Sequence, residues 1–106
     1  MLKNFRTFNL AVNFYQLCKK LKLHRSLYDQ LYRATSSVCL NLAEGYGKPT
    51  YKDQRKFYYI AMGSFREAEA IILMEEINNQ NVLQTIDQLG GSLYKLCKSN
   101  TPYLEK

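Results

Sequence analysis

Apolar residues recur along this chain at spacings of three and four, the period of an α-helix with one buried face. Four such stretches follow one another, at about residues 4–23, 26–45, 51–78 and 82–98. The first is patterned on Leu10, Phe14, Leu17 and Leu21, and the fourth on Val82, Ile86, Leu89, Leu93 and Leu96. No stretch alternates apolar and polar residues as a strand would. The pattern therefore predicts an all-α fold.

Glycines and capping residues separate the four stretches. Gly45 and Gly47 lie where a glycine in the left-handed conformation would close the second helix. Thr50 is the expected N-cap of the third helix, and Ser26 and Asn81 are the expected caps of the second and fourth. Because the connections are short, we expect an antiparallel up-down-up-down four-helix bundle that forms a single domain over residues 1–106.

The third helix carries two apolar rows. One row is narrow and mostly small, and the other is bulky: Phe57, Ala61, Ser64, Ala68 and Ile71 beside Tyr58, Met62, Phe65 and Ile72. Gly63 lies nearby, and glycine in mid-helix costs about 1 kcal/mol relative to alanine, so we expect another backbone to come close there. Gly90 and Gly91 are expected to mark a close contact or a kink in the fourth helix. The third helix is either the centre of the bundle or also faces another subunit.

Charge is unevenly distributed along the chain. Lysine and arginine outnumber aspartate and glutamate by 15 to 9, a formal net charge of +6. In an up-down bundle, the starts of the first and third helices share one end with the ends of the second and fourth. That end collects most of the basic residues: Lys3, Arg6, Lys48, Lys52, Arg55, Lys56, Lys95 and Lys98.

The start of the third helix is the candidate nucleic-acid site within this end. Lys52, Arg55, Lys56 and Tyr59 follow a helical spacing that puts them on one stripe. Basic side chains neutralise phosphates and tyrosines stack on bases, so the stripe suits RNA or DNA. An ordinary solvated surface explains the same residues equally well.

Two segments, SSVCLNLAEGYGK and AMGSFREAE, carry a family resemblance. They resemble the bacterial four-helix-bundle family of 23S ribosomal RNA intervening-sequence proteins, which is related to the accessory protein of diversity-generating retroelements. The matching positions are Asn41, Ala43, Glu44, Gly45, Ala61, Gly63, Ser64 and Glu67. Val38, Cys39 and Leu40 stand where the family often has Ile-Pro-Ser, so its helix-kinking proline is absent.

The resemblance implies a homopentamer associated with nucleic acid. The alternative function is an oligomeric protein-interaction scaffold, for example one that presents the bundle to a reverse transcriptase, as the accessory relatives do. We expect Asn41 to hydrogen-bond the turn backbone that follows it. Glu44 is expected to accept from turn amides or to pair with a nearby base, and Glu67 to pair with a neighbouring base or a second subunit.

Catalysis, metals and membranes are not expected. His24 is the single histidine, and Cys18, Cys39 and Cys97 are far apart in the sequence, which is typical of reduced core thiols and not of a zinc site. No set of residues for nucleophilic catalysis and no phosphate-binding glycine loop is present. No apolar run is long enough to span a membrane, and we expect a cytoplasmic, non-enzymatic protein without cofactors.

Overall fold

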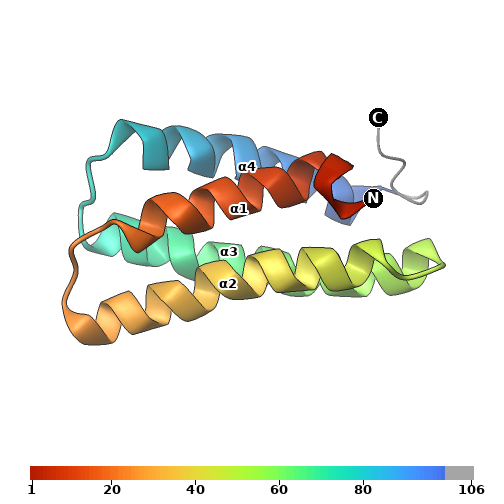
Figure 1. Ribbon diagram of the computed structural model, residues 1–106, viewed down its shortest axis with the longest axis horizontal. Coiled ribbons are helices and arrows are strands. Elements are labelled where there is room, and N and C mark those ends of the chain that lie inside the picture. Colours follow the sequence, from red (N-terminus) through yellow and green to blue (C-terminus); the bar gives the residue numbers. More distant parts are fainter. Residues whose placement is uncertain (100–106) are drawn as a thin grey trace.

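The computed structural model describes residues 1–99, and these form four α-helices that run alternately up and down (Figure 1). The helices are α1 at Arg6–Lys19, α2 at Arg25–Tyr46, α3 at Tyr51–Met74 and α4 at Gln80–Lys98, and a 3-10 turn, η1, at Leu2–Asn4 precedes them. The described residues contain no strand. The predicted antiparallel four-helix bundle is confirmed.

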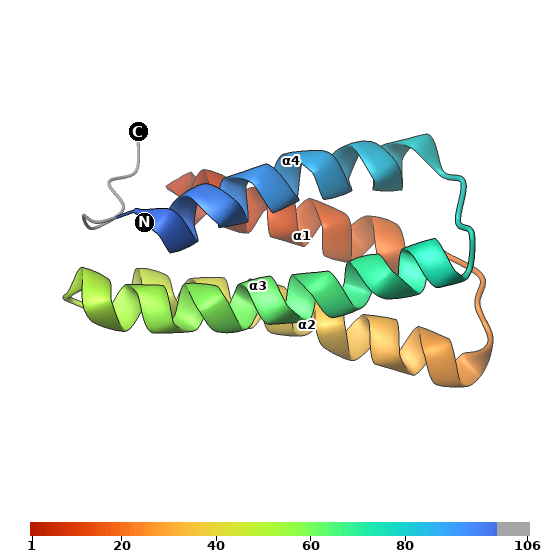
Figure 2. The same cartoon turned by 180° about the vertical axis from the view of Figure 1, so that it is seen from behind.

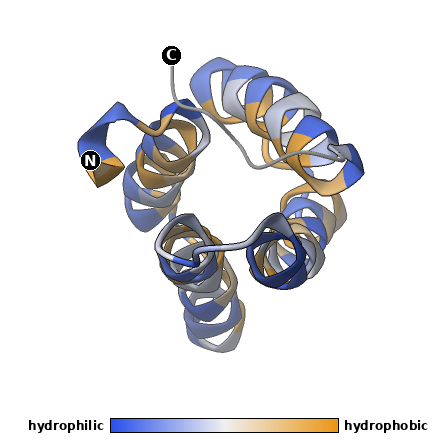
Figure 3. Ribbon diagram, turned by 90° about the vertical axis from the view of Figure 1, so that its right-hand side faces the viewer, coloured by the Kyte–Doolittle hydropathy of each residue, from blue (hydrophilic) through white to orange (hydrophobic). Residues whose placement is uncertain are grey.

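Each helix packs against two neighbours. The most extensive contact joins α2 to α3, and α1 packs against α2 and α4, while α4 also packs against α3. Viewed along its length, the bundle is a square of helices whose hydrophobic residues face inward (Figure 3). The helices α1 and α2 form one face (Figure 1), and α3 and α4 form the opposite face (Figure 2).

Two helices end earlier than the apolar pattern predicts. The first ends at Lys19 and the third at Met74, because the last apolar residues of both patterns belong to the connections that follow. The start of α3 agrees with the prediction. Thr50 is its N-cap, and its Oγ1 accepts a hydrogen bond from the backbone N–H of Asp53 at 3.3 Å.

The predicted caps of α2 and α4 are each two residues too late. His24 caps α2, where its Nδ1 accepts from the N–H of Ser26 at 3.3 Å. Asn79 caps α4, where its Oδ1 accepts from the N–H of Val82 at 3.1 Å. An N-cap is set by which acceptor reaches the first free N–H groups. In a run that holds several suitable side chains, the path of the loop decides, and Asn81 already lies inside the helix.

The buried face of α1 is also rotated from the predicted one. Its fully buried residues are Thr7, Ala11, Phe14 and Cys18, whereas Leu10, Leu17 and Leu21 are only partly buried. The hydroxyl of Thr7 hydrogen-bonds that of Ser92 on α4, which satisfies a polar group at the helix contact. The orientation of α1 is therefore decided by its two neighbours and not by its own largest apolar residues.

Gly45 permits the close contact between α2 and α3. A Cβ added to Gly45 would lie 2.7 Å from the Cε1 of Tyr58 and 3.0 Å from the Cβ of Phe57. Gly45 lies inside α2, and Gly47 ends the helix with φ of −81°, so neither adopts the predicted left-handed conformation. Gly45 is needed for space at the helix contact and not for backbone freedom.

The other helical glycines divide into two kinds. A Cβ on Gly90 would lie 3.2 Å from the ring of Phe65, which confirms the predicted close contact at this position. Cβ atoms on Gly63 and Gly91 would meet nothing within 4 Å. The prediction that a backbone approaches Gly63 is wrong within the chain, because Gly63 faces outward from α3.

All three cysteines are reduced and buried. Burial raises the pKa of Cys18 to about 12 and that of Cys39 to about 11, and it also raises the pKa of Cys97. Within residues 1–99, no group of three or more His, Cys, Asp and Glu side chains is arranged to hold a metal ion. No helix in this range is long and apolar enough to cross a membrane.

We expect Gly45→Ala to lower the free energy of unfolding by about 1–3 kcal/mol, because the added methyl group must displace Tyr58 and Phe57. Gly91→Ala is the matched control. Its added methyl group meets no atom, so the better helix propensity of alanine should raise stability by up to about 1 kcal/mol. Urea unfolding followed by circular dichroism measures both changes, and equal effects of the two substitutions would contradict the role given to Gly45.

We expect native Cys18 and Cys39 to react slowly with iodoacetamide at pH 8. The thiolate is the reactive form, and burial keeps both thiols protonated well above this pH. Unfolding in urea should restore ordinary reaction rates, because the pKa of an exposed cysteine is near 8.5. Mass spectrometry of digested protein follows each site, and rapid alkylation of the native protein would show that these thiols are not held in the core.

Candidate nucleic-acid interface

The predicted basic residues belong to segments that meet at one end of the bundle. The connection between α2 and α3, the N-terminus and the end of α4 all lie there (Figure 1). Lys3 lies in η1, Arg6 begins α1, Lys48 lies between α2 and α3, Lys52, Arg55 and Lys56 lie in the first turns of α3, and Lys95 and Lys98 lie in the last turn of α4. We call this set of residues the basic end.

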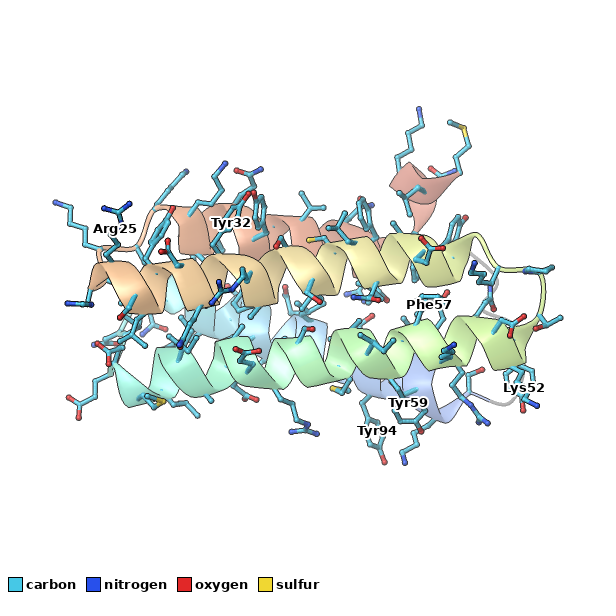
Figure 4. The ribbon with its side chains drawn as sticks, turned by 90° about the horizontal axis from the view of Figure 1, so that it is seen from below. Arg25, Tyr32, Lys52, Phe57, Tyr59 and Tyr94 are labelled. Atoms are coloured by element: carbon cyan, nitrogen blue, oxygen red, sulfur yellow. The ribbon has the colours of Figure 1, made fainter. Side chains whose placement is uncertain are left out.

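The stripe at the start of α3 is mostly open to solvent. Lys52, Lys56 and Tyr59 are exposed, with 47% of Tyr59 accessible. Figure 4 shows Lys52 near the tip of the bundle and Tyr59 further along the same helix. Arg55 is half-buried, and its guanidinium lies over the ring of Tyr51 at 5.1 Å from the centroid. Three of the four predicted residues therefore present their side chains to solvent, and Arg55 packs beside them.

Two lysines flank the ring of Phe57. The Nζ of Lys48 lies 5.2 Å from the ring centroid and that of Lys56 lies 5.9 Å away, within the range of cation–π contacts. Lys48 also pairs with Glu44, with 3.1 Å between Nζ and Oε2. Of the two roles expected for Glu44, pairing with a base is the one observed. Sequence reasoning assigned Phe57 to the core and missed its place between two cations.

The end of α4 adds a second exposed aromatic side chain. Tyr94 is 56% exposed, and the Nζ of Lys98 lies 5.7 Å from its ring centroid. This pair was missed, although the four-residue spacing of the two residues was a visible signal. Burial raises the pKa of Cys97, and the positive charges of Lys98 and Arg55 partly offset this rise. Their shared influence on Cys97 indicates that the start of α3 and the end of α4 lie together.

The ring of Tyr46, at the same end of the bundle, packs against the N-terminal segment. Tyr46 is the last residue of α2, and its ring stacks on Phe5 with 4.8 Å between centroids. Its hydroxyl donates to the carbonyl of Met1 at 3.2 Å and accepts from the Met1 amino group at 3.4 Å. Tyr46 therefore ties the N-terminal segment to α2. Within residues 1–99, the exposed tyrosines near this end are Tyr59 and Tyr94.

Three polar residues of the α2–α3 hairpin, Asn41, Ser37 and Ser64, form a hydrogen-bonded group that lies away from the basic end. Asn41 Nδ2 donates to the carbonyl and hydroxyl oxygens of Ser37 at 2.9 and 3.1 Å, and the Ser37 and Ser64 hydroxyls lie 2.7 Å apart. The prediction that Asn41 bonds the following turn is wrong, because its partner lies one helical turn upstream. Glu67 is exposed on α3 and makes no ion pair within residues 1–99.

The fold and the charges define a class of protein, an antiparallel four-helix bundle with eight of its 15 basic residues at one end. The family model described as 23S rRNA-intervening sequence protein matches residues 5–101, so the chain belongs to this family. The match covers all four helices. Neither a curated protein nor a solved structure matches the chain.

We expect Ser37→Ala and Ser64→Ala each to lower the free energy of unfolding by about 1 kcal/mol, since each removes one partner of a hydroxyl pair. The double variant should lose less than the sum of the two, because no hydroxyl is left without its partner. A thermal or urea double-mutant cycle measures this coupling. Strictly additive losses would show that the 2.7 Å contact does not connect α2 to α3 energetically.

Proposed function

We propose that this protein is a non-enzymatic, cytoplasmic, nucleic-acid-binding member of its family, which holds RNA or DNA through phosphate contacts at the basic end. The observation that carries the proposal is the exposure of Lys52 and Lys56 at the start of α3. The first turn of a helix also presents free backbone N–H groups, which favour an anion. The family description, which names 23S rRNA, favours RNA as the ligand.

The charge balance of the basic end supports this function. Within residues 1–99, eight basic residues lie there, and the opposing carboxylates are Glu44, which already pairs with Lys48, and Asp53 in the first turn of α3. Lysines that contact phosphates release condensed cations, so binding gains free energy without base-specific contacts. Tyr59 offers an exposed ring on which an unpaired base can stack. This combination suits a single-stranded or structured RNA without a strict sequence preference.

We further propose that the protein acts as a homo-oligomer, for which the resemblance implies a pentamer. Repeating a basic end around an assembly multiplies the number of phosphate contacts available to one RNA molecule. The alternative function is a protein-interaction scaffold, with a reverse transcriptase as one candidate partner. Exposed apolar side chains on the helices, such as Leu40 and Leu73, favour a protein contact as well.

We expect Lys52→Gln/Lys56→Gln to weaken RNA binding and to flatten its salt dependence. Each phosphate contact contributes about 0.7 to the slope of log K against log salt for a single strand, so the slope should fall by about 1.4. The variant should fold normally because both side chains are exposed. Fluorescence anisotropy with a labelled single-stranded RNA across a salt series gives both quantities.

Lys20→Gln/Lys22→Gln is the matched control, because it removes two exposed lysines from the opposite end. We expect it to change the affinity and slope much less than the α3 variant. Equal effects of the two variants would contradict the assignment of binding to the basic end. Wild-type protein that assembles but binds no RNA at low salt would favour the protein scaffold instead.

A further inference from the structure

A groove runs along the face formed by α1 and α2. It has a volume of about 330 Å³, and its lining is mainly apolar: Val12, Tyr15, Gln16, Tyr32, Ser36, Cys39 and Leu40. Leu40 is 68% exposed and Tyr32 is 46% exposed. Large apolar side chains in this position lose contact with water only if another molecule covers the groove.

The walls of this groove are ordered by contacts between aromatic rings. The rings of Tyr15 on α1 and Tyr32 on α2 lie 5.8 Å apart, and the Nζ of Lys19 lies 5.3 Å from the centroid of Tyr15. A preformed surface of this kind can accept a rigid partner without first being reorganised.

The opposite face, formed by α3 and α4, also exposes large apolar side chains. Tyr94 is 56% exposed and Leu73 is 65% exposed. A smaller groove of about 250 Å³ lies between the two helices, where Met62, Arg66, Glu69 and Asp87 are among the lining residues. In Figure 4, Tyr32 lies along one edge of the molecule and Tyr94 along the other. Because the two apolar surfaces lie on opposite faces, copies of the chain can join side by side, with the α1–α2 face of one copy against the α3–α4 face of the next.

The charges beside these two surfaces are complementary at the end of the bundle opposite the basic end. Beside the α1–α2 groove, the bases Lys19, Arg25 and Arg33 outnumber the acid Asp29. Beside the α3–α4 face, the acids outnumber the base Arg66: Glu69, Glu75, Glu76 and Asp87. The two groups have opposite signs, so they attract when the two faces meet.

The registers of the helices place these charges at matching heights. Ser37 on α2 lies opposite Ser64 on α3. Because the two helices are antiparallel, four residues back along α2 correspond to four residues forward along α3. Arg33 is therefore level with Ala68, the neighbour of Glu69. By the same register, Arg25 is level with Glu76. Copies that point the same way therefore set the basic group against the acidic one. Copies that point in opposite directions would set Arg25 near Lys98, where like charges repel.

We infer that the α1–α2 groove is the docking site for the α3–α4 face of a second copy of this chain, with both copies pointing the same way. This inference deepens the proposed oligomer by naming the two surfaces that form it. A contact between two different surfaces leaves one free groove and one free α3–α4 face, so further copies add. They form a ring if the rotation between successive copies closes, and a filament if it does not. All the basic ends then lie on one side of the assembly.

Two substitutions test the inference by blocking one surface each. Leu40→Arg blocks the groove, and Leu73→Arg blocks the α3–α4 face and places a cation opposite Lys19 and Arg25. Both leucines are mostly exposed, so both variants should fold. Light scattering behind size exclusion should find the wild type assembled and each variant monomeric. Gln88→Arg is the control, since it adds the same charge to the α1–α4 side and should stay assembled.

Mixing the two blocked variants gives the sharpest test. Each retains one intact surface, so the mixture should form a 1:1 heterodimer of twice the 12.4 kDa chain mass and nothing larger. The inference is overturned if the wild type is monomeric, if the mixture stays monomeric, or if Leu73→Arg remains assembled while Leu40→Arg does not. The last result would indicate that two grooves meet face to face.

RNA titrations of the same samples keep this inference separate from the proposed function. The substitutions lie outside the basic end, so monomeric Leu40→Arg should still bind RNA, more weakly than the assembled wild type. Assembly as described without any RNA binding would contradict the proposed function alone. RNA binding by a wild-type monomer would contradict the docking surface alone.

Discussion

The close contact between α2 and α3 sets the register on which the rest of the bundle depends. Gly45 has no side chain, and Tyr58 and Phe57 fill the space against the backbone of α2. Further along the same seam, the hydroxyls of Ser37 and Ser64 meet at 2.7 Å. A shift of either helix by one turn would drive a side chain into Tyr58 and separate the two hydroxyls. The two contacts are therefore compatible with a single alignment.

This alignment determines where charge is concentrated. With α2 and α3 in register, Lys48 comes to lie over Phe57 beside Lys56, and the start of α3 meets the end of α4 near Cys97. Few acids within residues 1–99 balance the bases there. At the other end, bases outnumber acids on the α1–α2 face and acids outnumber bases on the α3–α4 face. The two ends of the bundle therefore differ in charge. This difference determines whether two associating copies attract or repel each other when they point the same way or in opposite directions.

Much of the fold could be predicted from local patterns. The three-and-four spacing identified all four helices, and the acceptor position of Thr50 identified the start of α3, because both depend on residues close in sequence. The buried face of α1 could not be found in this way. Its largest apolar residues, such as Leu10, are only partly buried, since the positions of α2 and α4 turn Ala11 and Phe14 toward the core.

The candidate site shows the same division. The sequence by itself determined that four amphipathic helices form and, through their up-down order, which basic residues share an end. Only the tertiary structure decided which of those side chains are open, because exposure depends on neighbours from other helices. Tyr46 is held by Met1 and Phe5, whereas Tyr94 is free of the core and exposed. Gly45 and Gly63 look alike in the sequence, yet one touches Tyr58 and the other faces outward, since only packing distinguishes them.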